Sequence, residues 1–148
     1  MPLSDIESNA SRLQAQHQAV KDTFSRRSRS PADRQAWQDA CFRFREAHDR
    51  LSFPGGLANG MSRLAEADPT TVEESIRFLE ADPWFFRSGY IKAEIIRHLR
   101  RVPLSTAQEA RLRDVILTRV HGRDTREFRW YCRLAREVFD LDFQREIE

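Results

Sequence analysis

The feature that most constrains the fold is a series of apolar residues spaced three and four apart, interrupted by sharp helix start signals. Ser4 to Glu7 forms a capping-box pattern, and Ser30 with Pro31 is typical of an N-cap followed by proline at the first helical position. Glycine and proline total only 11 of 148 residues, so few positions interrupt a helix. The sequence therefore predicts an all-α protein, and its length suits a single domain covering residues 1–148.

Residues 4–53 predict a hairpin of two long antiparallel helices. The first helix is expected from Ser4 to about Ser28, and the second from Pro31 to Leu51, where "SFPGG" ends it. Each helix has one apolar face, which in the first comprises Ile6, Ala10, Leu13, Val20 and Phe24 and in the second Ala36, Trp37, Ala40, Cys41, Phe44, Ala47, His48 and Leu51.

Residues 57–139 predict further helices, followed by an acidic tail over 140–148. The expected segments are 57–67, 71–81, one that starts at Asp82 and Pro83 and runs to "VPLS", one started by the capping box Ser105 to Gln108, and one from Asp124 to about Phe139. Two of these segments look alike at an offset of 42 residues, which is within the spacing of HEAT repeats. We expect HEAT-like stacked helix pairs, and an irregular orthogonal helical bundle fits the pattern equally well.

The stretch "DPWFFRSGYIKAEIIRHLRR", residues 82–101, predicts a helix with two apolar faces. Helical spacing assigns Trp84, Ile91, Ile95 and Leu99 to a core stripe. The opposite face holds Phe86, Tyr90 and Arg97. These three side chains either pack against a second layer or form a partner-binding strip.

The last helix predicts a more regular arrangement of arginines. Its apolar face consists of Phe128, Tyr131, Leu134, Ala135 and Val138, and its other face of Arg126, Arg129, Arg133 and Arg136, with Trp130 at the edge. Such a face is either solvated or binds a partner, because arginine and tryptophan are common at interface hot spots.

The charge distribution favours an acidic partner for this part of the chain. Net charge is only +2, but residues 84–136 contain 13 arginines and lysines against 5 acidic residues, a local excess of +8. The chain has 23 arginines and 2 lysines, so a general preference for arginine explains part of this excess.

Motifs for catalysis, metal binding or cofactor binding are lacking. Four histidines and two cysteines occur at separate sites without HExxH or CxxC spacing, and no phosphate-binding glycine loop is found. No apolar run approaches the roughly 18 residues that span a bilayer, and the first residues do not resemble a signal peptide. We expect no catalytic residues, metal, cofactor or membrane contact, and a cytoplasmic location.

The segments "RFLEADPWFFRSGYIKAEIIRHLRR" and "REFRWYCRLAR" resemble the short all-helical, HEAT-like proteins of bacteria, many of which look like immunity proteins encoded beside polymorphic toxins. The resemblance covers residues 77–139 and rests on helical pattern and size. It implies a stoichiometric inhibitor that binds its toxin, often over the active site, and has no reaction of its own.

The leading hypothesis is therefore a protein-binding module of the immunity type, with a cognate toxin or another acidic protein surface as partner. One alternative is a nucleic-acid-binding helical-repeat protein, with the same arginines on phosphates and Trp130 or Tyr90 stacking on bases. A second alternative is a small helical enzyme, whose pocket collects residues such as His48, Asp49 and Tyr90.

Overall fold

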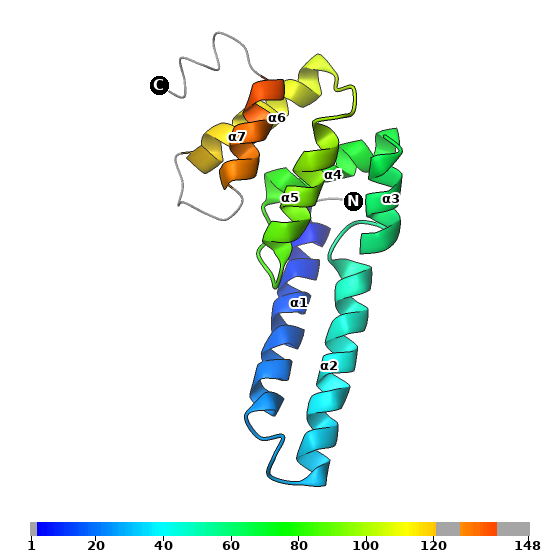
Figure 1. Cartoon of the computed structure of the whole chain (residues 1–148), viewed down its shortest axis with the longest axis vertical. Helices are drawn as coiled ribbons and strands as arrows, with labels where there is room; N and C mark the ends of the chain where they lie inside the picture. Colours follow the sequence, from blue (N-terminus) through cyan, green and yellow to red (C-terminus); the bar gives the residue numbers. More distant parts are fainter. Residues whose placement is uncertain (1–2, 121–127, 139–148) are drawn as a thin grey trace. The chain divides into compact units, whose positions relative to one another are not determined.

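A computed structural model of the chain describes residues 3–120 and 128–138 (Figure 1). These residues form seven α-helices and no strand, which confirms the all-α prediction. The helices are α1 (Leu3–Phe24), α2 (Pro31–Leu51), α3 (Leu57–Ala65), α4 (Pro69–Ala81), α5 (Ser88–Leu99), α6 (Thr106–Val120) and α7 (Phe128–Glu137). The predicted helix start at Asp124 and the acidic tail over 140–148 lie outside the described residues.

The chain divides into two compact units, each with its own buried side chains. Unit 1 holds the residues up to Gly60 together with Pro83–Ser88, and unit 2 holds Met61–Asp82 together with the residues from Gly89 onwards. The HEAT-like stacking of helix pairs stays a prediction.

Two helix starts follow the predicted capping chemistry closely. The side chain of Ser30 accepts a hydrogen bond from the backbone N–H of Asp33 at 3.0 Å, and Pro31 occupies the first helical position. Ser105 and Gln108 form the reciprocal capping box, with backbone N–H groups donating to the partner's side chain at 3.0 and 3.1 Å. Both starts satisfy backbone donors that the first helical turn leaves unpaired.

In unit 1, α1 and α2 run antiparallel and side by side, joined by a turn over residues 25–30 (Figure 1). The predicted apolar positions Ile6, Ala10 and Leu13 of α1 are buried. Phe24, which the sequence assigns to the same apolar face, is instead 48% exposed. The centres of its ring and the Trp37 ring are 6.0 Å apart in an edge-to-face arrangement, and no third helix among the described residues of unit 1 covers Phe24 at this end.

In unit 2, α6 packs against both α4 and α7. The buried side chains are mainly branched aliphatic residues of four helices and of the position directly after α7: Val72, Ile76, Leu79, Ile91, Ile95, Ile96, Leu99, Leu112, Val115, Ile116, Leu134 and Val138. This core holds α7, and with it the arginine-rich face that the sequence predicts, in a defined orientation on α6.

The predicted start of the fifth helix at Asp82 is wrong, because α5 begins at Ser88. Asp82 has a left-handed backbone (φ 47°) and ends α4, with its N–H donating to the carbonyl of Phe78. Arg87 is also left-handed (φ 68°), which prevents a continuous helix from Asp82 into α5.

Because α5 begins at Ser88, the burial of two aromatic side chains before it differs from the prediction. Trp84, predicted in the core stripe, is 76% exposed, whereas its neighbour Phe85 is 5% exposed. Ile91, Ile95 and Leu99 are buried as predicted, because they lie within α5 itself. Residues 83–87 form a non-helical connection that ends in a turn, where the N–H of Ser88 donates to the carbonyl of Phe85 at 3.0 Å, so helical spacing does not govern which of its rings is buried.

Candidate protein-binding surfaces

Helix α7 presents the arginine stripe, defined here as Arg129, Arg133 and Arg136 with Trp130 beside them. The opposite side of the helix is fixed in the core of unit 2 by Tyr131, Leu134 and Val138, which are at most 1% exposed. Two arginines of neighbouring segments secure its C-terminal end: Arg113 Nη1 donates to the carbonyl of Val138 at 2.9 Å, and Arg100 Nη2 lies 3.2 Å from Glu137 Oε1. The orientation of the stripe is therefore set by buried contacts.

The guanidinium groups of the stripe lie close to an aromatic ring. The guanidinium carbons of Arg129 and Arg133 are 5.4 and 4.8 Å from the centre of the Trp130 ring, within cation–π distance. Arg129, Arg133 and Arg136 are exposed, and the indole is partly exposed. Ion pairs among the described residues involve other arginines, such as Arg100, and none involves these three. Arg126, predicted as the first member of the stripe, lies outside the described residues.

Tyr90 and Arg97 of the predicted strip both lie on α5. Tyr90 is 58% exposed. Arg97 is exposed but donates a hydrogen bond to Glu94, whose carboxylate also lies 3.4 Å from His98 Nε2. A partner would have to compete with Glu94 for this arginine. Arg97 therefore differs from the arginines of α7, whose charges are not matched by a described carboxylate.

Phe86, the third residue of the predicted strip, lies in unit 1 outside any helix and does not continue the face of α5. Its ring is 43% exposed and contacts His17 and Phe44 at centroid distances of 4.6 and 5.8 Å. Phe85 approaches His48 at 6.1 Å. Sequence reasoning missed this ring cluster, because His17 and Phe86 are far apart in the chain and no local pattern connects them.

A mainly apolar hollow of about 310 Å³ lies beside the ring cluster, between α1 and α2. Phe44, His48 and Phe86 line it together with Val20. Burial and the nearby charge of Lys21 lower the pKa of His17 from its ordinary value, so this imidazole is neutral at physiological pH. Asp49 and Tyr90, which the enzyme hypothesis places with His48, are not among the residues that line the hollow.

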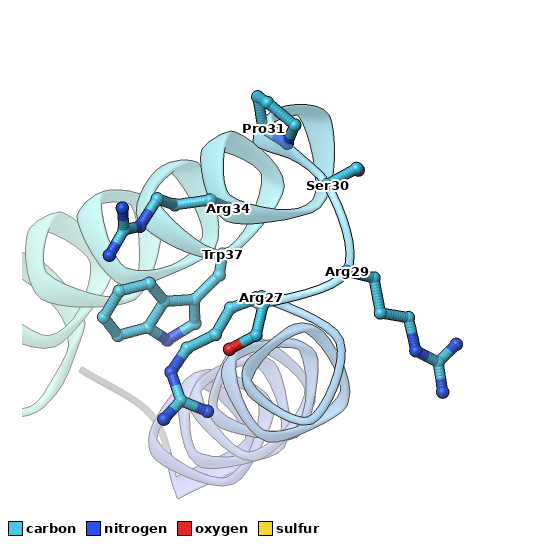
Figure 2. A pocket seen from close by; sticks show the side chains of 7 residues that line it. Arg27, Arg29, Ser30, Pro31, Arg34 and Trp37 are labelled. Carbon is cyan, nitrogen blue, oxygen red and sulfur yellow. The ribbon is translucent and has the colours of Figure 1, made fainter.

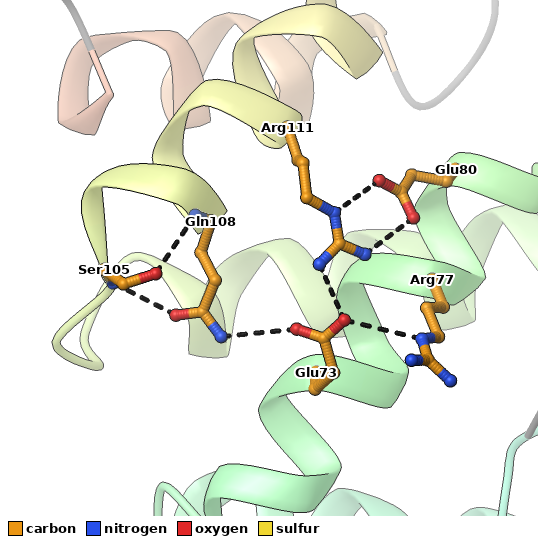
Figure 3. Close-up of polar contacts among 6 residues, drawn as sticks. All are labelled: Glu73, Arg77, Glu80, Ser105, Gln108 and Arg111. Carbon is orange, nitrogen blue, oxygen red and sulfur yellow. Dashed lines mark hydrogen bonds and ion pairs between the residues drawn. The ribbon is translucent and has the colours of Figure 1, made fainter.

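The most connected polar group joins α4 to α6 in unit 2 (Figure 3). Arg111 donates to both carboxylate oxygens of Glu80 at 2.7 and 2.8 Å and to Glu73 at 2.6 Å, and Gln108 donates to Glu73 at 3.4 Å. The hydrogen bond from Arg111 lowers the pKa of Glu73, and the hydrogen bonds to Glu80 raise the pKa of Arg111. Each charge in this group has a partner, so we interpret it as a structural tie between the two helices.

Neither a metal centre nor a membrane-spanning element is found in residues 3–120 and 128–138. No three histidine, cysteine or acidic side chains gather there in a way that could hold a metal ion. No helix in these ranges is both long enough and apolar enough to cross a bilayer. Comparison with models of protein families, with curated protein sequences and with solved structures finds no match to this chain.

Proposed function

We propose that the chain is a protein-binding module of the immunity type, which binds and neutralises a cognate bacterial toxin through the arginine stripe of α7. The observation that carries the proposal is the placement of Trp130 beside the guanidinium groups of Arg129 and Arg133 on the exposed side of the helix. The resemblance of residues 77–139 to immunity proteins supplies the class of partner.

The physical case rests on the cost of ordering side chains at an interface. An exposed arginine loses about 0.5–1.5 kcal/mol of conformational entropy when it is immobilised by a partner. Arg129 and Arg133 are already near the Trp130 ring, and each cation–π contact at an exposed site contributes roughly 0.5–1 kcal/mol. Part of the loss in side-chain entropy therefore occurs on folding, before a partner binds.

The stripe selects a partner with exposed carboxylates. Guanidinium groups bind carboxylates with two parallel hydrogen bonds, and no described carboxylate neutralises Arg129, Arg133 or Arg136. Complementary charge also accelerates association at low salt. A toxin with an acidic surface around its active site fits these requirements.

The decisive experiment pairs the chain with the product of the gene that lies next to its own. We expect co-expression to protect cells from that product, and the purified proteins to form a stoichiometric complex. The double variant R129E/R133E should weaken the complex by at least about a hundredfold, because two attractive contacts become repulsive. R12E is the matched control, since Arg12 is an exposed arginine on α1 of unit 1. Absence of binding and protection, or equal loss in R12E, would overturn the proposal.

The nucleic-acid alternative uses the same side chains and differs in its salt dependence. An arginine stripe on phosphates predicts affinity that falls steeply between about 50 and 200 mM salt, with Trp130 stacking on bases. If single-stranded nucleic acid binds in this way and R129E/R133E abolishes it, the stripe is a nucleic-acid surface and the immunity proposal fails.

A further inference from the structure

The turn between α1 and α2 carries a second concentration of arginines, separate from α7. Arg26, Arg27, Arg29 and Arg34 fall within nine residues of "RRSRSPADR". None of them takes part in an ion pair between described residues. We call the hollow that three of these arginines line, together with Trp37, the turn pocket; its volume is about 620 Å³.

Arg27 and Arg34 of the turn pocket lie near the Trp37 ring (Figure 2). The guanidinium group of Arg27 lies 3.5 Å from the centre of the Phe24 ring and 5.9 Å from that of Trp37, and its Nη1 donates to the Phe24 carbonyl at 2.7 Å. Arg34 and Trp37 are three residues apart on α2, which makes them neighbours on its surface. In Figure 2 their end groups lie near each other, while Arg29 points outwards from the turn.

Asp33 is the one carboxylate within the sequence of the turn, and it is engaged elsewhere. It accepts a hydrogen bond from the Ser30 hydroxyl at 2.9 Å, as part of the cap of α2. The N-terminus of α2 adds its own partial positive charge to the same region. The turn pocket is therefore electropositive, although Asp33 offsets part of the charge.

The combination of guanidinium groups with a partly exposed indole selects a particular ligand chemistry. Guanidinium groups bind phosphate oxygens through paired hydrogen bonds, and an indole stacks on a flat heterocycle. A volume of about 620 Å³ lies within the range of small-molecule pockets.

We propose that the turn pocket binds a nucleoside phosphate, either as a free nucleotide or as one unit of a single strand. Arg34 holds the phosphate, and the base stacks on Trp37. The site lies in unit 1, so the inference does not depend on the proposed role of α7.

The test follows the indole N–H signals of the three tryptophans by NMR in the full-length, isotope-labelled protein. The signal of Trp37 is identified by its loss in W37F. The probes are adenosine monophosphate, inorganic phosphate, adenosine and an oligothymidylate of roughly ten nucleotides. We expect the nucleotide or the oligonucleotide to shift the Trp37 signal in a saturable way, and phosphate or adenosine alone to bind at least about tenfold more weakly.

The probes and variants separate the outcomes. Comparable affinity for the mononucleotide and the oligonucleotide identifies a free nucleotide as the ligand, and binding of the oligonucleotide alone identifies a single strand. R34A should weaken binding by about tenfold, while R12A should leave it unchanged. Binding to W37F, which lacks the Trp37 signal, is followed by the backbone amide signals of the turn and should also be weaker. Circular dichroism checks that the variants fold. The proposal is overturned if neither nucleotide probe shifts the Trp37 signal, if R34A binds as the wild type does, or if polyglutamate binds equally well.

Discussion

Asp82 and Lys92 form an ion pair in unit 2 that ties the end of α4 to the first turns of α5. Lys92 Nζ donates to Asp82 Oδ1 at 2.7 Å, and only 4% of the lysine side chain is exposed. The other carboxylate oxygen lies 2.7 Å from Arg119 Nη1 of α6. One aspartate therefore connects three helices through two cations.

Removal of the charge at Asp82 should destabilise unit 2, because Lys92 would keep a buried positive charge beside a neutral amide. Asparagine also tolerates the left-handed backbone, so D82N isolates the loss of charge. We expect the free energy of unfolding to fall by about 2 kcal/mol, less than for a fully buried pair since Asp82 is 33% exposed.

Urea denaturation followed by circular dichroism measures the loss. D49N, at an exposed position of α2, is the control and should change stability little. The double variant D82N/K92M should regain part of the loss, because methionine places no charge in the core. A D82N protein as stable as the wild type contradicts this account.

The ion pair between Asp82 and Lys92 explains why the sequence pattern predicts the wrong start for α5. Three times in this chain a polar residue precedes a proline, at Ser30, Asp68 and Asp82. The first two cap a helix, and Asp68 accepts a hydrogen bond from the backbone N–H of Thr71 at 2.9 Å. At Asp82 the carboxylate instead binds Lys92 and Arg119, which lie 10 and 37 positions further on. The local pattern of a polar residue before proline is the same at all three sites. Contacts with residues distant in the sequence decide whether the polar residue begins a helix.

The exposed position of Trp84 leads to a prediction that distinguishes the structure from the sequence pattern. Gln14 Nε2 donates to the backbone carbonyl of Trp84, so the contact does not depend on the indole. We expect W84A to change the free energy of unfolding by no more than about 0.5 kcal/mol. F85A should lower it by roughly 3 kcal/mol, because Phe85 is buried and faces His48.

Thermal and urea melts of W84A and F85A, measured side by side, test this difference. Both variants remove a large aromatic side chain from neighbouring positions, so each is a control for the other. If W84A is the more destabilised of the two, then Trp84 belongs to the core as the helical pattern predicts, and the described connection over 83–87 is incorrect.

The arginine tie between α4 and α6 should contribute measurably to stability. Arg111 bridges Glu73 and Glu80, and each of these side chains is about one third exposed. R111M would leave Glu80 without this cation and Glu73 with Arg77, whose Nε lies 3.4 Å from Glu73 Oε1. We expect a loss of about 1–2 kcal/mol, limited by solvent screening, in urea denaturation. R101M, which removes an exposed arginine after α5, is the control and should lie within about 0.5 kcal/mol of the wild type.

The lowered pKa of Glu73 makes part of this stability depend on pH. A carboxyl group whose pKa is lower in the folded state stabilises the protein above its unfolded value of about 4.5, and that stability disappears as pH falls through the folded value. We expect the wild type to lose more stability than E73Q between about pH 6 and pH 3.

The double variant E73Q/R111M identifies the cause of this pH dependence. The hydrogen bond from Arg111 is the largest contribution to the lowered pKa of Glu73. In the R111M background, the E73Q substitution should therefore change the pH dependence of stability much less than it does in the wild type. The measurement is urea denaturation of the wild type, the two single variants and the double variant at both pH values. Equal pH dependence in the wild type and E73Q would show that Glu73 does not carry the effect.

The candidate surfaces differ in how far the sequence predicts them. On α7, helical periodicity alone assigns Tyr131, Leu134 and Val138 to the core and Arg129 and Arg133 to the opposite side, and the structure agrees. Both sides of α7 are formed by residues close together in the sequence, so helical spacing is sufficient to predict them. The contact between Phe86 and His17 depends on a connection that passes along α1, and the exposure of Phe24 depends on which helices surround it. Neither the contact nor the exposure can be predicted from the spacing of nearby residues in the sequence.

Gly60 provides the sharpest test of packing in unit 1. It lies within α3, and a Cβ atom at this position would be 2.2 Å from Cδ1 of Phe53 and 3.1 Å from the carbonyl oxygen of Pro54. Phe53 is 1% exposed, so relief of this contact would require a buried ring to shift. Helix propensity alone predicts that G60A is more stable by about 1 kcal/mol. The clash predicts the opposite sign, a loss of roughly 1–3 kcal/mol.

Urea denaturation of G60A decides between the two effects. N59A, at the adjacent exposed position of the same helix, is the control for propensity and should change stability little or raise it slightly. Replacement of the ring by a smaller side chain in F53L should relieve the clash, so the loss in F53L/G60A should be less than the sum of the two single losses. A G60A protein that is more stable than the wild type would mean that Phe53 does not pack against α3 as described.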